Sequence, residues 1–114
     1  MDSRTTVAEL KVMVERFVHQ RDWEQFHTPK NLSMGLAIEA AELMELFQWY
    51  SGPDSIRVAQ QRRVKQAAAD ELADCVIYCL SFATATGIDV AAAVRRKLRK
   101  NRRKYPVRTS RGRF

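Results

Sequence analysis

The segment "ELADCVIYC", residues 71–79, combines an apolar helical pattern with two acidic residues. Its apolar side chains recur at the spacing of a buried helix face. Glu71 and Asp74 are three residues apart, so they share one face of that helix. Burying carboxylates is costly unless something positive meets them. The segment therefore predicts a core helix whose acidic pair binds a positively charged group.

A second acidic pair with the same spacing, Glu39 and Glu42, lies in "AIEAAELMELFQW", residues 37–49. Trp49 lies seven residues after Glu42, and Tyr78 lies four residues after Asp74. At helical spacing, each aromatic residue therefore shares a helix face with one acidic pair. Each pair alone would be typical of a solvated helix face. If the two helices face each other, however, four carboxylates converge and a divalent cation relieves their repulsion. Oxygen ligands without a nearby His or thiol favour Mg²⁺, with Mn²⁺ as the other candidate.

Length and composition indicate a single globular domain. The chain has 114 residues, of which 46% are hydrophobic and 29% are charged. No apolar run approaches the length of a membrane span, and the N-terminus lacks the pattern of a signal peptide. Cys75 and Cys79 sit inside the apolar helix, where core packing is the expected role rather than a disulfide framework. We therefore expect a cytoplasmic protein.

Charge is distributed unevenly along the chain. Residues 95–114 hold 11 Lys and Arg and no Asp or Glu, whereas residues 1–94 hold 9 basic and 13 acidic residues. A basic C-terminal region indicates a partner rich in phosphate. We expect one domain over residues 1–107, followed by a basic, mobile tail at residues 108–114.

Helical periodicity predicts an all-α fold without strands. Ser33 is expected to cap the second helix, Gly52-Pro53 to end it, Gly87 to end the third helix and Asp89 to cap the fourth. Short connections between helices are typical of an antiparallel four-helix bundle. The expected helices cover approximately residues 5–20, 33–50, 54–86 and 89–103, and the third could be bent or interrupted near residues 63–66.

Three further sequence blocks accompany the acidic pairs: "RDWEQFHTPKNL" at 21–32, "ELFQW" at 45–49 and "NRRKYP" at 101–106. Together with the pattern E-x-x-E, 28 residues, E-x-x-D, they resemble the all-α nucleotide pyrophosphohydrolases of the MazG type. The resemblance is closest to the dCTP pyrophosphatase branch and covers about residues 5–107. The general motif begins with two adjacent Glu, but here Ile38 takes the first position, as a non-acidic residue does in that branch.

The resemblance implies a fold, a reaction and a metal. Such enzymes cleave a nucleoside triphosphate between the α and β phosphates, releasing a monophosphate and pyrophosphate and so cleaning the nucleotide pool. For this chain, dCTP or a related pyrimidine is the implied substrate. The implied Mg²⁺ site and catalytic group consists of Glu39, Glu42, Glu71 and Asp74. Which glutamate orients or deprotonates the attacking water stays open.

Flat side chains near the acidic helices are candidates for stacking on the nucleobase. Each aromatic taken alone would be equally typical of core packing, but the resemblance also implies an aromatic base pocket. The candidate base-binding residues are Trp23, His27, Asn31, Trp49 and Tyr78. The candidate phosphate-binding residues are Lys30, Lys97, Asn101 and Arg102.

Two expectations concern partners. A basic helical nucleic-acid-binding module without catalysis is the alternative function, but four converging carboxylates would repel a phosphate backbone, so nucleic acid is not expected as a partner. The second and third predicted helices carry large apolar residues around their circumference, which predicts a homo-oligomer. The resemblance implies dimers or tetramers with the pocket near a subunit boundary, so we expect a tetramer built from dimers, oligomerising through its helices. In such an assembly Trp23 and His27 could serve a neighbour's metal site.

Overall fold

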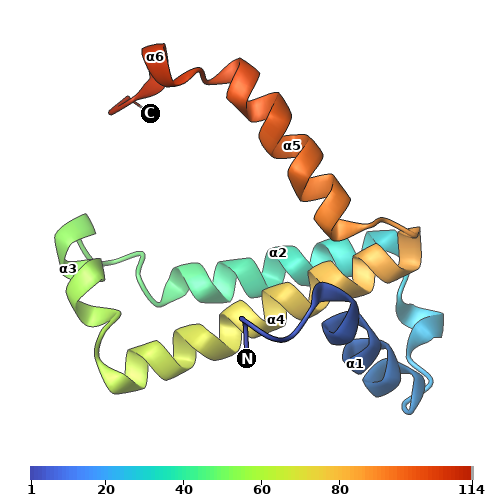
Figure 1. Ribbon diagram of the computed structural model, residues 1–114. Coiled ribbons are helices and arrows are strands. Elements are labelled where there is room, and N and C mark those ends of the chain that lie inside the picture. Colours follow the sequence, from blue (N-terminus) through green and yellow to red (C-terminus); the bar gives the residue numbers. More distant parts are fainter. Residues whose placement is uncertain (114) are drawn as a thin grey trace.

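The computed structural model describes residues 1–113, which fold entirely into helices and connections (Figure 1). The predicted all-α class is confirmed. The elements are α1 (Val7–His19), the 3₁₀ helix η1 (Glu24–Phe26), α2 (Pro29–Glu45), α3 (Gly52–Val58), α4 (Arg62–Thr86), α5 (Val90–Lys104) and α6 (Val107–Ser110).

The body of the fold is an antiparallel pair, α2 and α4, with α1 packed against the C-terminal half of α4 (Figure 1). Leu32 on α2, Val18 on α1 and Leu80 on α4 are buried where these helices meet. Their burial removes apolar surface from water and stabilises the three-helix contact. This arrangement fixes one face of α2 against one face of α4, which are the faces that carry the acidic pairs.

The helix α5 leaves this body. Gly87 adopts a left-handed conformation with φ 68° and ends α4. The Asp89 side chain then caps α5 by accepting a hydrogen bond from the Ala92 amide at 2.8 Å. Both predicted signals are confirmed, and they produce a bend of 101° between α4 and α5. As a result, α5 projects from the α2–α4 pair within one chain (Figure 1).

No single helix within residues 1–113 is long and apolar enough to cross a membrane. Taken together, α4 and α5 would be long and apolar enough for a membrane span, but the chain bends by 101° between them.

The expected start and end of the second helix were wrong. The helix α2 begins at Pro29, and its cap is Thr28, whose hydroxyl accepts a hydrogen bond from the Asn31 amide at 3.2 Å. Ser33 instead donates to the Lys30 carbonyl at 2.8 Å from inside the first turns. Proline fits this position because the first helical amides need no partner within the helix. The helix also ends at Glu45, about five residues earlier than expected.

The predicted third helix is two helices. Ser51 caps α3 by accepting from the Asp54 amide at 3.2 Å, so Gly52-Pro53 begins a helix. The helix α3 ends at Val58, and α4 begins at Arg62. Part of the expected tail is also helical, because residues 107–110 form α6. Phe114, the last residue of that tail, lies outside the described residues.

Gly35 allows α2 to approach α4 closely. A Cβ atom built at this position would lie 2.6 Å from Cζ of the Tyr78 ring, which is closer than atoms of folded proteins pack. The ring of Tyr78 therefore rests directly on the α2 backbone. This contact positions Tyr78 beside the acidic faces of the two helices.

Replacing Gly35 with Ala tests this approach. We expect a loss of about 1 kcal/mol in the free energy of unfolding, because displacing the ring costs more than the helix propensity of Ala returns. In a Tyr78→Ala background the same change should increase the free energy of unfolding, since only the higher helix propensity of Ala remains. Gly52→Ala is the matched control, because a Cβ there meets nothing within 4 Å. Denaturant titrations measure the free energy of unfolding of each protein. If Gly35→Ala changes it in the same direction with and without Tyr78, the proposed clash between the added Cβ and the Tyr78 ring is wrong.

Candidate active site

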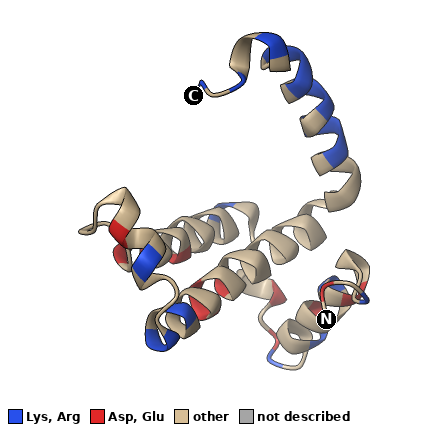
Figure 2. Cartoon of the chain, turned by 60° about the vertical axis from the view of Figure 1, so that its left-hand side comes forward, with Lys and Arg blue, Asp and Glu red and all other residues tan. Residues whose placement is uncertain are grey.

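Three carboxylates converge between α2 and α4. Glu39 and Glu42 come from α2 and Glu71 comes from α4, and each offers an oxygen within 4.8 Å of the other two. Figure 2 shows acidic residues on both helices. The spacing of three residues on α2 places both of its glutamates on the side that faces α4. A cluster of oxygen ligands at this separation could hold a hard divalent cation.

The cluster is electrostatically strained when no cation is present. Burial of Glu39, its hydrogen bond and repulsion with Glu42, and the charges of Asp74 and Glu71 raise its pKa to about 7. The pKa of Glu71 is also raised, first by burial and then by the charge of Glu42. Both shifts mean that the charged forms lack a compensating positive group.

One oxygen in the cluster has no partner. The Oε2 atom of Glu71 is buried and makes no hydrogen bond. Buried carboxylate oxygens normally accept hydrogen bonds or bind metals. An oxygen without a donor, inside a cluster of like charges, fits a bound cation.

Asp74 lies one helical turn beyond Glu71 and is exposed. It is not part of the close group of three carboxylates, although its charge contributes to the raised pKa of Glu39. Asp74 and Glu39 instead line the same pocket, which has a volume of about 410 Å³. The structure therefore brings three of the four predicted ligands together and sets the fourth at the mouth of the neighbouring pocket.

Aromatic side chains line part of this pocket, together with aliphatic residues of α1 and α4. Trp23, His27 and Tyr78 line it, and the same three residues line an adjoining hollow of about 260 Å³. A flat ring could lie between these walls, with the acidic cluster at one end. The geometry thus combines an oxygen-rich cation site with an aromatic pocket that shares Glu39.

The remaining predicted base-binding residues lie in different places. Asn31 lines the smaller hollow, but its Nδ2 donates to the Phe26 carbonyl at 3.0 Å, which ties η1 to the start of α2. Trp49 lies beyond the end of α2, is 88% exposed and lines neither hollow. A single chain therefore groups Trp23, His27, Asn31 and Tyr78 but leaves Trp49 outside.

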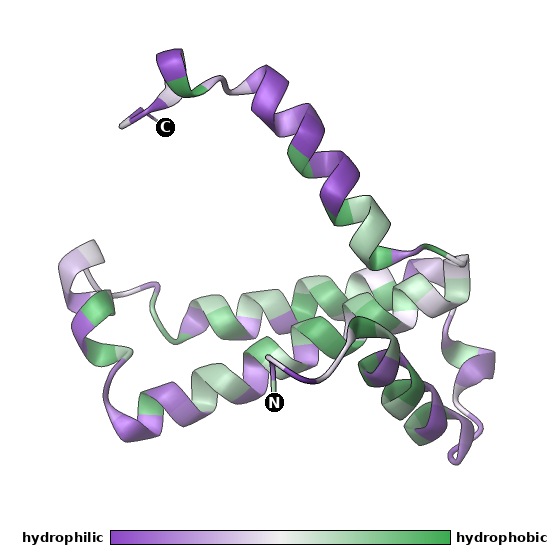
Figure 3. Ribbon diagram, viewed as in Figure 1, coloured by the Kyte–Doolittle hydropathy of each residue, from purple (hydrophilic) through white to green (hydrophobic). Residues whose placement is uncertain are grey.

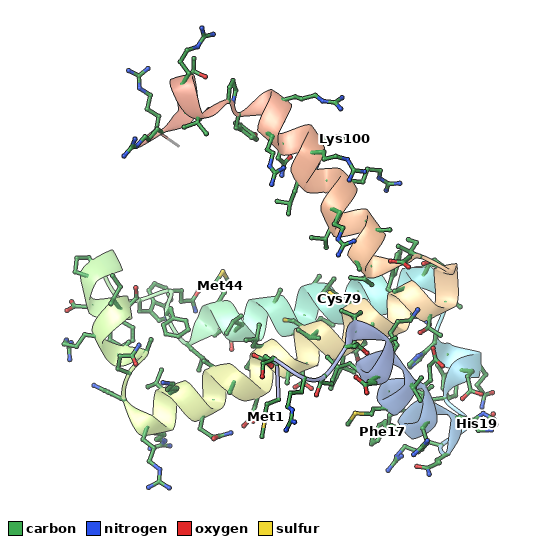
Figure 4. The ribbon with its side chains drawn as sticks, viewed as in Figure 1. Met1, Phe17, His19, Met44, Cys79 and Lys100 are labelled. Atoms are coloured by element: carbon green, nitrogen blue, oxygen red, sulfur yellow. The ribbon has the colours of Figure 1, made fainter. Side chains whose placement is uncertain are left out.

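Phe17 also lines this pocket, although the sequence pattern did not single it out as a site residue. Its ring, on α1 (Figure 4), meets Trp23 edge-on at 5.8 Å between centroids. Arg21 lies 3.7 Å from the Phe17 centroid and donates to the Phe17 carbonyl at 2.9 Å. These contacts hold the Trp23 loop against α1. The sequence does hold a signal for this contact, because Phe17, Arg21 and Trp23 are close in sequence and meet where α1 turns into the following loop.

The predicted phosphate-binding residues are not gathered at the cluster. Lys30 is exposed in the first turn of α2. Lys97, Asn101 and Arg102 lie on α5, which projects away from α2 and α4 (Figure 1). Within one chain, these three side chains therefore belong to a different part of the molecule.

Comparisons with known proteins agree with the resemblance predicted from the sequence. Residues 35–113 match the model of the MazG-like family. The chain is 40% identical to dCTP pyrophosphatase 1 of Rattus norvegicus over 94% of its own length and 63% of the relative's. It is 37% identical to the Homo sapiens protein of the same name, over 93% and 62%. The chain thus spans less than two thirds of the curated relatives it matches.

A solved structure is similar along nearly the whole chain. The crystal structure of a pyrophosphatase from Archaeoglobus fulgidus matches with a TM-score of 0.82 and 41% sequence identity. The match covers 87% of this chain and 91% of the other. The predicted resemblance is therefore confirmed in both sequence and fold.

Replacing Glu71 with Gln tests the carboxylate cluster. In EDTA the variant should melt at a higher temperature than the wild type, because one of the repelling charges is gone. At about 100 times its Kd, Mg²⁺ should stabilise the wild type by about 2.7 kcal/mol and have almost no effect on the variant. Glu45→Gln is the control, since it removes the same charge from α2 outside the cluster. Thermal melts with and without Mg²⁺ provide the measurement, and equal Mg²⁺ responses in both variants would contradict the site.

Proposed function

We propose, because the chain belongs to the MazG-like family, that it is a nucleoside triphosphate pyrophosphohydrolase. It would hydrolyse the bond between the α and β phosphates and release a nucleoside monophosphate and pyrophosphate. The observation that carries this proposal is the cluster of Glu39, Glu42 and Glu71, with its unpartnered Oε2 atom, beside an aromatic pocket. The names of the curated relatives and of the solved structure support it.

The proposed metal is Mg²⁺, with Mn²⁺ as a substitute. Glu39, Glu42 and Glu71 would hold it, and Asp74 would complete the ligand set from the pocket side. A bound divalent cation supplies charge neutralisation at phosphate oxygens and lowers the pKa of water. The carboxylates also position a water molecule by accepting its hydrogen bonds, so that water can attack the triphosphate directly.

The proposed base site is the aromatic pocket next to the carboxylates. Trp23 and Tyr78 would stack on the base, and His27 would hydrogen-bond to its edge or to the sugar. Because the walls share Glu39 with the cluster, a base held there leaves its triphosphate close to the acidic group. The preference for dCTP or a related pyrimidine rests on the relatives named dCTP pyrophosphatase 1.

The protein is further proposed to act as a tetramer built from dimers. Large apolar side chains remain exposed on the three helices of the body, including Phe17 at 48%, Ile38 at 57% and Leu72 at 56%. Figure 3 shows that hydrophobic residues predominate along these helices, in contrast to α5. Water-exposed apolar area of this kind is expected at subunit interfaces. A second copy could also supply Trp49, Lys97, Asn101 and Arg102, which one chain leaves away from its own cluster.

Assays with individual nucleotides test the activity. With Mg²⁺ and each deoxynucleoside triphosphate in turn, we expect the monophosphate and pyrophosphate as products, with dCTP turned over fastest. Glu71→Gln should reduce turnover by orders of magnitude because the cation site is lost, whereas Glu45→Gln should stay near wild type. Release of orthophosphate and a diphosphate would rule out the proposed reaction. A preference for purines would rule out only the proposed substrate.

Mixing two impaired variants tests whether subunits share sites. Light scattering should give a mass about four times 13.2 kDa. Trp49→Ala and Glu71→Gln should each lower activity as pure proteins. After they are unfolded together and refolded, mixed assemblies should regain activity, because some sites then combine an intact Trp49 with an intact Glu71 from another chain. A monomer with full activity, or no gain on mixing, would contradict shared sites.

A further inference from the structure

Six basic residues of α5 form two adjacent rows along one side of the helix. Arg95, Arg99 and Arg103 repeat at intervals of four, and so do Arg96, Lys100 and Lys104, one position later. Residues four apart share a helix face, so the rows run side by side. All six residues are exposed, and Figure 2 shows the run of Lys and Arg along α5. We call this surface the double basic row.

The opposite side of α5 has a different character. Val90, Val94, Leu98 and Tyr105 form an apolar stripe with Asn101 in the same sector. Lys97 lies at the border between that stripe and the double basic row. Of the proposed phosphate-binding residues on α5, Asn101 therefore shares the side suited to subunit packing, and Lys97 and Arg102 lie at the two borders of that side. Packing of the apolar stripe against another subunit would leave the double basic row facing outward.

The double basic row has no internal counter-charge. Among residues 1–113, ion pairs join only His19 with Glu24 and Arg57 with Asp54. No acidic residue lies between position 90 and the end of the chain. Lys100, labelled in Figure 4, lies on the part of α5 that projects from the body. Six like charges on neighbouring turns repel one another, so an external polyanion would stabilise this helix.

We propose that the double basic row binds the phosphate backbone of nucleic acid, independently of the base sequence. Six cations lie within about 14 Å of helix length, at a rise of about 1.5 Å per residue. Duplex DNA carries one charge per about 1.7 Å of its axis, so the two charge densities are of similar size. Arg supplies four of the six charges, and its guanidinium can bind phosphate with two parallel hydrogen bonds. Basic residues from α6 onward, Arg108, Arg111 and Arg113, extend the same charge.

An anionic membrane is the less favoured partner. A helix that lies on a membrane buries a broad apolar face of residues such as Trp, Phe and Leu and carries Lys and Arg on its polar face. The apolar stripe of α5 is narrow and holds no Trp or Phe, and the subunit packing considered above would cover it and leave only the double basic row outward. The surface therefore matches a charged polymer better than a lipid interface.

The acidic cluster does not oppose this binding. Glu39, Glu42 and Glu71 lie between α2 and α4, whereas the double basic row lies on the projecting α5. The sequence argues against a nucleic-acid partner only if the carboxylates and the basic residues share one surface, where the carboxylates would repel the phosphates. Their separation in the fold removes that objection, and the inference does not depend on the proposed hydrolysis.

Fluorescence anisotropy with a labelled, mixed-sequence duplex of 20 base pairs tests the proposal. Full-length wild-type protein should bind with an affinity that falls steeply as NaCl increases. Arg96→Gln, Lys100→Gln and Lys104→Gln combined should weaken binding by at least about tenfold and reduce the salt slope by about 2.7. Arg62→Gln, Arg63→Gln and Lys65→Gln combined form the matched control, since they remove the same charge from exposed positions at the start of α4.

Three outcomes would overturn the proposal. The first is equal binding by the α5 and α4 triple variants, with helical content confirmed by circular dichroism. The second is loss of DNA binding in excess dCTP, which would place the DNA in the nucleotide pocket. The third is retention on phosphatidylserine vesicles without affinity for the duplex. Hydrolysis of dCTP by the α5 variant should stay at the wild-type rate, so failure of the DNA proposal is distinguishable from failure of the enzyme.

Discussion

The repulsion among carboxylates held between α2 and α4 is the constraint on which the rest of the structure depends. Glu39, Glu42 and Glu71 would separate in water, but the antiparallel helix pair keeps their oxygens within 4.8 Å. The Gly35–Tyr78 contact sets how closely the helices approach, and buried Leu32 and Leu80 support the same pairing. Hydrophobic burial elsewhere thus offsets the electrostatic cost at the cluster. A cation that relieves this cost would bind to a site already formed by the fold, and such a preformed site favours tight and specific binding.

Much of this arrangement could be predicted from the sequence because its determinants are local. The i,i+3 acidic pairs, Gly87 as a helix end and Asp89 as a cap each depend on a few neighbouring residues. The errors at Pro29 and Pro53 have a common cause. The expected second helix starts after Pro29 and ends at Pro53, although Thr28 and Ser51 precede these prolines as caps and proline is favoured in the first turn of a helix. The sequence therefore contains the correct signal, because a capping residue followed by proline marks the start of a helix rather than its end.

The positions of Trp49 and Lys97 could not be predicted in the same way. Periodicity correctly places Lys97 on a helix, and Trp49 follows Glu42 at helical spacing, but periodicity does not specify where the chain turns. The end of α2 at Glu45 takes Trp49 off the acidic stripe, and the 101° bend after α4 carries Lys97 away from the cluster. Conversely, the contacts of Phe17 with Trp23 and Arg21 arise from a loop that folds back on α1. Such placements depend on long-range packing, which the local sequence pattern does not specify.

The isolation of α5 has a consequence for how this helix forms. Helix nucleation is unfavourable, and a helix of 15 residues without tertiary support is only marginally stable in water. The repeated cations at intervals of four oppose it further, whereas Asp89 at its start favours it. The coil-to-helix equilibrium of this segment is therefore coupled to whatever covers its stripe or neutralises its charges. Added salt and association both shift that equilibrium toward helix, so the helicity of the chain beyond Gly87 depends on its surroundings more than that of the α1–α2–α4 body does.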